Sequence, residues 1–191
     1  MNRRTLLGRM SGLLATVCAA VVGVPAVRFL IAPLYENKSK RSVVQRVARL
    51  DQLRVGEPVQ FNVLGSRRDA WTLYPKGNLG IVWLVRRTSE STAPQDAKVD
   101  AYSAECPHLG CTIQRSASKA EFDCPCHKAV FDFSGDAVDT RTRGYVNPAP
   151  RSMDALTCHV VSVSAGESKE WWVEVEYQRF KAGLTTQIPV V

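Results

Sequence analysis

The stretches AECPHLGC (residues 104–111) and DCPCHKAV (residues 123–130) are the most informative part of this sequence. The whole chain of 191 residues has six cysteines and three histidines. Four of the cysteines and two of the histidines lie in these two stretches, as Cys106, His108, Cys111, Cys124, Cys126 and His127. Thiolates and imidazoles gathered from two loops are the usual ligands of a transition-metal centre.

Three kinds of site compete for these residues. A zinc site of two Cys and two His usually separates its first ligand pair by two or more residues, but one residue separates Cys106 from His108. Zinc would also leave Cys111 and Cys126 without a role. Disulfides alone would suit an exported domain but would assign nothing to the histidines. A [2Fe–2S] cluster with two Cys on one iron and two His on the other uses four residues, and the two left over can form a disulfide.

The segments CPHLGC and CPCH resemble, in order and separation, the two cluster-binding loops of the Rieske iron–sulfur proteins. The resemblance implies cluster loops at 104–112 and 122–131. Within them it implies that Cys106 and Cys124 ligate one iron, that His108 and His127 ligate the other, and that Cys111 and Cys126 form a disulfide. This extra cysteine pair is typical of family members in quinol-oxidising complexes and of arsenite oxidase small subunits. Rieske ferredoxins and ring-hydroxylating oxygenases resemble the four-ligand pattern but lack the pair.

The rest of the chain after residue 50 reads as β-structure. Segments rich in Val, Ile, Trp and Tyr are expected to be strands, at 59–65, 70–75, 80–87 and 170–180. In the last of these, Trp171, Val173, Val175 and Tyr177 alternate with Trp172, Glu174 and Glu176, so the two sets face opposite ways. Residues 88–98 are expected to form a polar surface loop. Short strands between Gly, Pro, Asn and Ser clusters predict an antiparallel sandwich or small barrel. We therefore expect a mostly β fold, with a β-sandwich Rieske domain and its cluster-binding subdomain over 47–191.

Charge and hydropathy set the N-terminal part apart. Residues 1–54 carry ten Lys/Arg and two Asp/Glu, whereas the remaining 137 residues carry fifteen and sixteen. The apolar run over 10–34 is long enough to cross a membrane and longer than the apolar core of a cleaved signal, so a retained single-pass anchor is expected. Arg3-Arg4, within a cytoplasmic segment 1–9, resembles a twin-arginine export signal, and residues 35–46 read as a flexible tether. A near-neutral main domain argues against a nucleic-acid partner.

The resemblance extends to NPAPRSM (147–153), at the place of a proline-rich loop beside the cluster, and to WVEVEYQRFKAG (172–183), a C-terminal strand. It implies the iron–sulfur subunit of a bacterial quinol–cytochrome c reductase, on the outer, periplasmic side of the inner membrane. Such a subunit takes an electron and a proton from quinol and passes the electron to a c-type cytochrome, beside a cytochrome b subunit. His127 and His108 would meet quinol, and Leu109 would lie on the docking tip. The alternative is an electron-transfer subunit of another respiratory or arsenite-oxidase-like complex; a zinc- or disulfide-stapled binding module is a third class.

The sequence departs from the family pattern after the second histidine. Quinol-oxidising members with high potentials often read CPCHGS-x-Y, and here Lys128, Ala129 and Phe131 replace Gly, Ser and Tyr. Ala129 and Phe131 cannot donate the hydrogen bonds to sulfur that stabilise the reduced form. This predicts a lower potential, matched to menaquinol rather than ubiquinol, although the charge of Lys128 acts in the opposite direction.

Other residues that could carry chemistry are expected to be structural. Cys18 lies in the apolar segment and reads as a small packing residue. Cys158 and His159 lie in a strand-like run, so their side chains should point to opposite faces. A solvated surface is expected for the remaining cations of interest, Arg141, Arg143 and Arg151.

Overall fold

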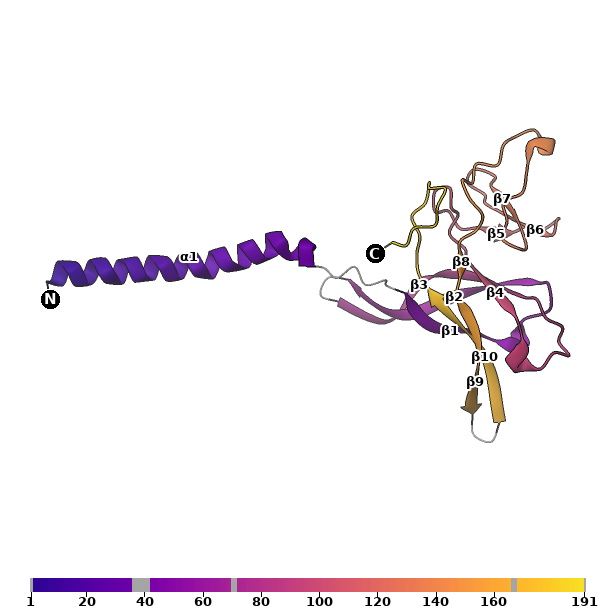
Figure 1. Ribbon diagram of the computed structural model, residues 1–191, viewed down its shortest axis with the longest axis horizontal. Coiled ribbons are helices and arrows are strands. Elements are labelled where there is room, and N and C mark those ends of the chain that lie inside the picture. The colour runs from indigo at the N-terminus through magenta and orange to yellow at the C-terminus, as the bar shows by residue number, and fades with distance from the viewer. Residues whose placement is uncertain (1, 36–41, 70–71, 166–167, 191) are drawn as a thin grey trace. The chain divides into compact units, whose positions relative to one another are not determined.

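A computed structural model describes residues 2–35, 42–69, 72–165 and 168–190 of the chain. The chain divides into two compact units, residues 1–39 and residues 40–191, and Figure 1 draws both. Of the predicted tether, residues 36–41 lie outside the described part. The strand β1 begins at Val43, so the last four residues assigned to the tether belong to the folded head.

The described part of the first unit consists of one helix, α1 (Arg3–Tyr35). Among the described residues it is the one helix long and apolar enough to cross a membrane: within Arg3–Ile31 an 18-residue window has a mean hydropathy of 2.1, and no part of that window is buried. The helix starts before the apolar run and includes Arg3, Arg4 and Arg9. An apolar surface exposed all round suits a lipid environment better than water.

The described part of the second unit, the head, contains three antiparallel sheets. The first has the order β1-β10-β9, the second β2-β3-β4-β8 and the third β5-β6-β7. The strands are β1 (Val43–Arg49), β2 (Pro58–Asp69), β3 (Thr72–Arg86), β4 (Val99–Ser103), β5 (Gln114–Arg115), β6 (Glu121–Asp123), β7 (Val130–Asp132), β8 (Ala155–Leu156), β9 (Cys158–Ala165) and β10 (Ser168–Tyr177). Short 3-10 turns lie at η1 (Leu50–Gln52), η2 (Pro94–Asp96) and η3 (Arg141–Arg143). The predicted mostly β, antiparallel class is confirmed.

Strand β3 lies between two hydrophobic cores and contributes side chains to both. Val82 and Leu84 pack with Val173 and Val175 of β10 in the first core, whereas Trp83 and Val85 face the second core. The second core is completed by residues of the small third sheet and the loops around it, including Phe122 and Phe131. Because both faces are covered, Val82 to Arg86 are buried without interruption, as expected for a strand inside a layered structure. Figure 1 shows β5, β6 and β7 grouped at one end of the head, away from the β9–β10 hairpin.

Two strand predictions need correction. The segments 70–75 and 80–87 were expected to be separate strands, but β3 runs without a break from Thr72 to Arg86. The Gly77-Asn78 pair does not form a turn; it lies opposite the irregular stretch of β2, where the register shifts at Leu64 and again before Arg67. Such irregularities add residues to a strand without ending its pairing. The segments 59–65 and 170–180 are largely confirmed, as parts of β2 and β10, and 88–98 lies between β3 and β4 as expected.

Strand β10 shows why the sequence alternates as it does. Val173, Val175 and Tyr177 are buried in the first core, and the residues between them are less buried. Full burial of such side chains contributes about 1.5–3 kcal/mol each. The predicted facing of this strand is therefore confirmed.

The Tyr177 hydroxyl has no hydrogen-bond partner within the described structure, and burial raises its pKa to about 12.

A glycine on β3 makes room for that tyrosine. A Cβ atom on Gly80 would overlap the Oη and Cζ atoms of Tyr177. We expect Gly80→Ala to lower the free energy of unfolding by about 2 kcal/mol, because overpacking of a filled core costs ~1–3 kcal/mol. Urea unfolding of the iron-loaded chain measures this. Tyr177→Phe alone should not lower stability, since the hydroxyl it removes is buried and unpartnered, and it should restore part of the loss in the double variant. An unchanged urea midpoint in Gly80→Ala would contradict this packing.

Candidate metal centre

The two loops that carry the cysteine and histidine residues have the same backbone turn. In the first loop the Gly110 amide donates to Cys106 O at 2.8 Å, and the Cys106 amide donates to Cys111 O at 2.8 Å. In the second loop Lys128 and Cys124 make the equivalent bond at 3.0 Å, and the Cys124 amide donates to the carbonyl of the residue after Lys128 at 2.8 Å. The bonds join residues at the same spacing in both loops, so the sequence fixes each cysteine by an identical local ring of hydrogen bonds.

The turn requires a left-handed residue at its fourth position after the cysteine. Gly110 takes that position in the first loop, with φ +78°, and Lys128 takes it in the second, with φ +60°. Among the described residues Lys128 is the one non-glycine residue with positive φ. Glycine adopts this conformation freely, whereas other L-residues pay ~1–2 kcal/mol. The family pattern CPCHGS, which has glycine here, was the sequence signal of this strain.

Lys128→Gly is accordingly expected to stabilise the head by about 1 kcal/mol, since relief of the left-handed backbone exceeds the added entropy of the unfolded chain. Gly110→Ala is the matched control, because a Cβ there meets nothing within 4 Å and the variant tests backbone conformation alone. It should destabilise by a similar amount. Chemical denaturation of both variants gives the two changes in unfolding free energy. Equal changes in the same direction would rule out left-handed backbone strain as their cause.

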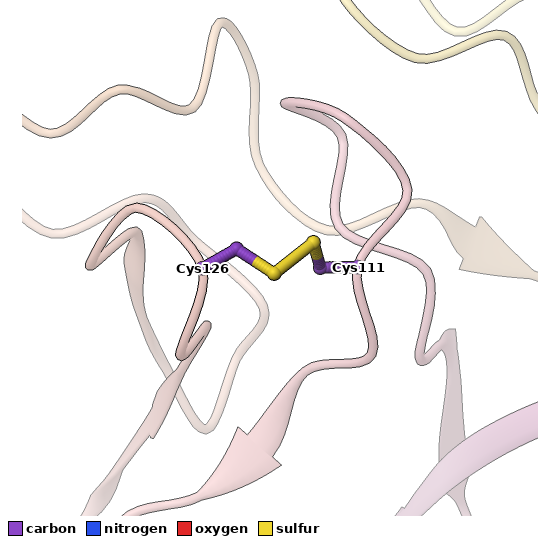
Figure 2. Close-up of a disulfide and its surroundings, with 2 residues drawn as sticks. All are labelled: Cys111 and Cys126. Carbon is purple, nitrogen blue, oxygen red and sulfur yellow. A yellow bond between two sulfur atoms is a disulfide. The ribbon is translucent and has the colours of Figure 1, made fainter.

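The two loops are joined by a disulfide between Cys111 and Cys126, whose Cα atoms lie 6.6 Å apart. Figure 2 shows the bond crossing from one loop to the other. This is the pairing that the family resemblance implied. The Sγ atoms of Cys111, Cys124 and Cys126 lie within 4.8 Å of one another, but two of the three are bonded to each other. The trio therefore offers a metal one thiol, that of Cys124.

The remaining donors are two buried thiols and two more exposed imidazoles. Cys106 and Cys124 are 1% and 3% exposed, whereas His108 is half-buried and His127 is exposed. The two imidazole rings lie 4.8 Å apart, centroid to centroid, at nearly a right angle. Burial, together with the neighbouring Cys124 thiol, raises the pKa of Cys106 to about 11. Loading a metal must therefore displace thiol protons. Two thiols and two adjacent imidazoles are the donor set that a [2Fe–2S] cluster of mixed ligation needs.

The loop tip and a third loop complete the surroundings. Leu109 stands at the tip of the first loop with 62% of its surface exposed. The proline-rich stretch at 147–153 lies against the second loop, because the Asn147 side-chain amide donates to Val130 O at 2.7 Å and to Val138 O at 3.0 Å. The contact fits the position beside the cluster loops that the sequence suggested.

The outcomes for the other candidates are mixed. Cys158 is confirmed as a strand residue, since its thiol donates to Val99 O and burial raises its pKa to about 11, while His159 is exposed. Arg143 forms an ion pair with Glu121 at 2.8 Å. The prediction of a solvated Arg151 is wrong: its side chain is 9% exposed and forms an ion pair with Asp154 at 2.7 Å.

Comparison with known proteins assigns the family. The sequence profile described as Rieske [2Fe-2S] domain matches residues 43–150. The chain is 30% identical, over 123 residues, to the menaquinol:cytochrome c reductase iron-sulfur subunit of Bacillus subtilis (strain 168), covering 63% of this chain and 66% of that protein, just under two thirds of its length. It is 24% identical over 187 residues to cytochrome b6-f complex iron-sulfur subunit 2 of Nostoc sp. (strain PCC 7120 / SAG 25.82 / UTEX 2576), covering 91% and 94%.

Among solved structures, a chain of a hyperthermophilic respiratory Complex III aligns with a TM-score of 0.33 and 19% identity, over 84% of this chain and 98% of that one. The profile match, by contrast, covers more than half of the sequence and both loops. The chain belongs to the Rieske [2Fe–2S] protein family, and its cofactor is a [2Fe–2S] cluster.

Proposed function

We propose that the chain is the electron-transfer iron–sulfur subunit of a membrane quinol–cytochrome c oxidoreductase of the bc type. The observation that carries this proposal is a pair of adjacent imidazoles, one half-buried and one exposed, in the same two loops as two buried thiols and a disulfide that joins the loops. The named function of the Bacillus subtilis relative supports menaquinol as the electron donor and a c-type cytochrome as the acceptor. A cytochrome b subunit would be the membrane partner.

In this proposal Cys106 and Cys124 hold one iron and His108 and His127 hold the other. A cluster ligated in this way supplies one-electron chemistry at a higher potential than an all-cysteine cluster. His127, the more exposed ring, accepts the hydrogen bond from the quinol hydroxyl through its free ring nitrogen, and His108 lies beside it. Leu109 meets the apolar wall of the quinol pocket, because an exposed leucine at a loop tip gains most from burial on docking.

The helix α1 would anchor the subunit in the bacterial inner membrane as a single span. Its basic residues Arg3, Arg4 and Arg9 would stay in the cytoplasm, in accord with the positive-inside rule. The head would then lie on the outer side, where an oxidising compartment preserves the Cys111–Cys126 disulfide.

The function is tested by purifying the full chain from detergent-solubilised membranes of cells that make it, and identifying its partners. The expected results are co-purification of a cytochrome b and appearance of the EPR signal of the reduced cluster when a menaquinol analogue is added to the oxidised protein. A different oxidoreductase as partner, with no response to quinol, would favour the alternative complex.

Leu109→Ala should slow quinol oxidation about tenfold, equivalent to ~1.4 kcal/mol of docking free energy, with unchanged iron content. Val146→Ala, at another exposed apolar residue, is the control.

The potential provides a separate prediction. Ala129 and Phe131 are fully buried in the second loop and strand β7 and carry no hydroxyl. Ala129→Ser together with Phe131→Tyr is expected to raise the midpoint potential, because hydroxyl donors to sulfur stabilise the reduced form. Redox titration followed by EPR measures the change. Ala137→Ser, at an exposed residue that forms a β-bridge with Phe131, serves as the control, and a midpoint that stays constant in the double variant would contradict the explanation.

A further inference from the structure

The chain after β10 folds back on itself beside the first cluster loop. The amide of Lys181 donates to Ile188 O at 2.9 Å, and that of Val190 donates to Arg179 O at 2.7 Å. Phe180 forms a β-bridge with Pro189 and is 9% exposed. We call residues 178–190 the strap. These bonds give the strap a defined shape, although its other side chains are mostly exposed.

The strap contacts the first loop between two proposed iron ligands. The Gly183 amide donates to the carbonyl of Pro107, the residue between Cys106 and His108, at 2.8 Å. Gly183 has φ +76°, so the close turn that presents this amide favours glycine. A second link joins Arg179 Nε to Glu105 Oε1 at 2.8 Å. The strap therefore touches the loop on both sides of Cys106.

Arg151 fixes the strap to the third loop. Its guanidinium donates to both carboxylate oxygens of Asp154, at 2.8 and 2.7 Å, and also to Leu184 O and Lys181 O, the latter at 3.0 Å. Asp154 is 4% exposed. A buried ion pair of this kind adds little net stability, but it is costly to leave partly unsatisfied. The two strap carbonyls accept hydrogen bonds from the guanidinium and so satisfy donor capacity that the carboxylate does not use. The ion pair and the strap therefore stabilise each other.

Together these contacts close a ring of four links around the site. The disulfide joins the first and second loops, Asn147 joins the second loop to the third, Arg151 joins the third loop to the strap, and Gly183 joins the strap to the first loop. We propose that the strap, held by Arg151 as a positioning residue, keeps the backbone around Cys106 and His108 in its ligating conformation. This inference rests on the ligand assignment in the proposed function.

The physical reason is that surface loops open locally at much lower free energy than cores do. Without the strap, the first loop would be held by its own turn, by the disulfide and by its bridge between Glu105 and Thr112. Local opening of the first loop should then become more frequent while the cores beneath it stay closed. The strap itself need not touch the cluster to have this effect.

Hydrogen exchange of the iron-loaded full chain in detergent tests the proposal. The variants are a deletion of residues 182–191, which removes the Gly183 and Leu184 contacts, and Arg151→Lys, which keeps a positive charge beside Asp154 but cannot donate to all four acceptors. Arg46→Lys is the matched control, because Arg46 forms an exposed ion pair with Glu174 in the first sheet. Exchange is compared between residues 104–113 and residues 58–65 of β2.

Both strap variants are expected to exchange at least tenfold faster over 104–113, with 58–65 unchanged, and to lose iron to a chelator faster than Arg46→Lys. Unchanged exchange over 104–113, or equal acceleration in both regions, would overturn the positioning role. Failure of the proposed function would look different, since it would appear as absent cytochrome partners or absent quinol response while the exchange difference persisted. A chain that purified without iron would refute the ligand assignment, and exchange over 104–113 would still decide whether the strap holds the loop.

Discussion

Cys124→Ser is expected to abolish cluster binding, so that the purified chain is colourless and contains essentially no iron. The Cys124 thiol is 3% exposed and stands beside Cys106, where a serine hydroxyl has neither the acidity nor the softness needed to bind iron. Iron analysis and the EPR spectrum of the reduced protein measure the loss. Cys106→Ser should give the same result.

Cys158→Ser is the matched control, because Cys158 is a further free, partly buried cysteine, and burial raises its pKa to about 11. Its thiol donates to a backbone carbonyl, a role that a serine hydroxyl can take over. The control should keep full iron content. If Cys124→Ser retained iron at the level of Cys158→Ser, the assignment of the cysteine ligands would be wrong.

Removing the disulfide between the two loops should produce the next largest effect, a loss of unfolding free energy and of iron retention on heating. Cys111 and Cys126 are fifteen residues apart in sequence, and in the chain-entropy account a cross-link closing a loop of that length contributes about 3 kcal/mol. We expect the double variant Cys111→Ser, Cys126→Ser to lose about that much unfolding free energy. It should also release iron at a lower temperature, because the disulfide is one of the links that hold the two ligand loops together.

The comparison is made by guanidinium unfolding and by following cluster absorbance during heating, both with and without a thiol reductant. Reductant should lower the unfolding free energy of the unaltered chain to that of the double variant, and it should leave the unfolding free energy of the double variant unchanged. A variant as stable as the unaltered chain under oxidising conditions would show that the loops are held by their hydrogen bonds alone.

The sequence predicted the cluster loops well because their information is local. Each loop places its cysteine, histidine and turn residue within a few positions. The first loop leads into β5 and the second connects β6 to β7, so both are attached to the same small sheet. The strain at Lys128 was also accessible, since the family pattern has glycine there. The alternation of β10 predicted its buried face, because one side of that strand packs on the first core.

Contacts between distant segments could not be predicted in this way. Arg151 looked like a surface cation, since nothing near it in sequence shows that the strap supplies two carbonyls to its guanidinium. The segments 70–75 and 80–87 looked like two strands, because glycine and asparagine lie between them and are common in turns, but β3 pairs with β2 through this stretch. Both outcomes depend on tertiary partners, which outweigh local preference.

The burial of both faces of β3 has a consequence for how the head unfolds. Its side chains alternate between the first core and the second, so neither core can be dismantled while the other stays intact along Val82 to Val85. Global unfolding of either core should therefore dismantle the ligand loops and release the cofactor, whereas local opening of the first loop leaves both cores folded.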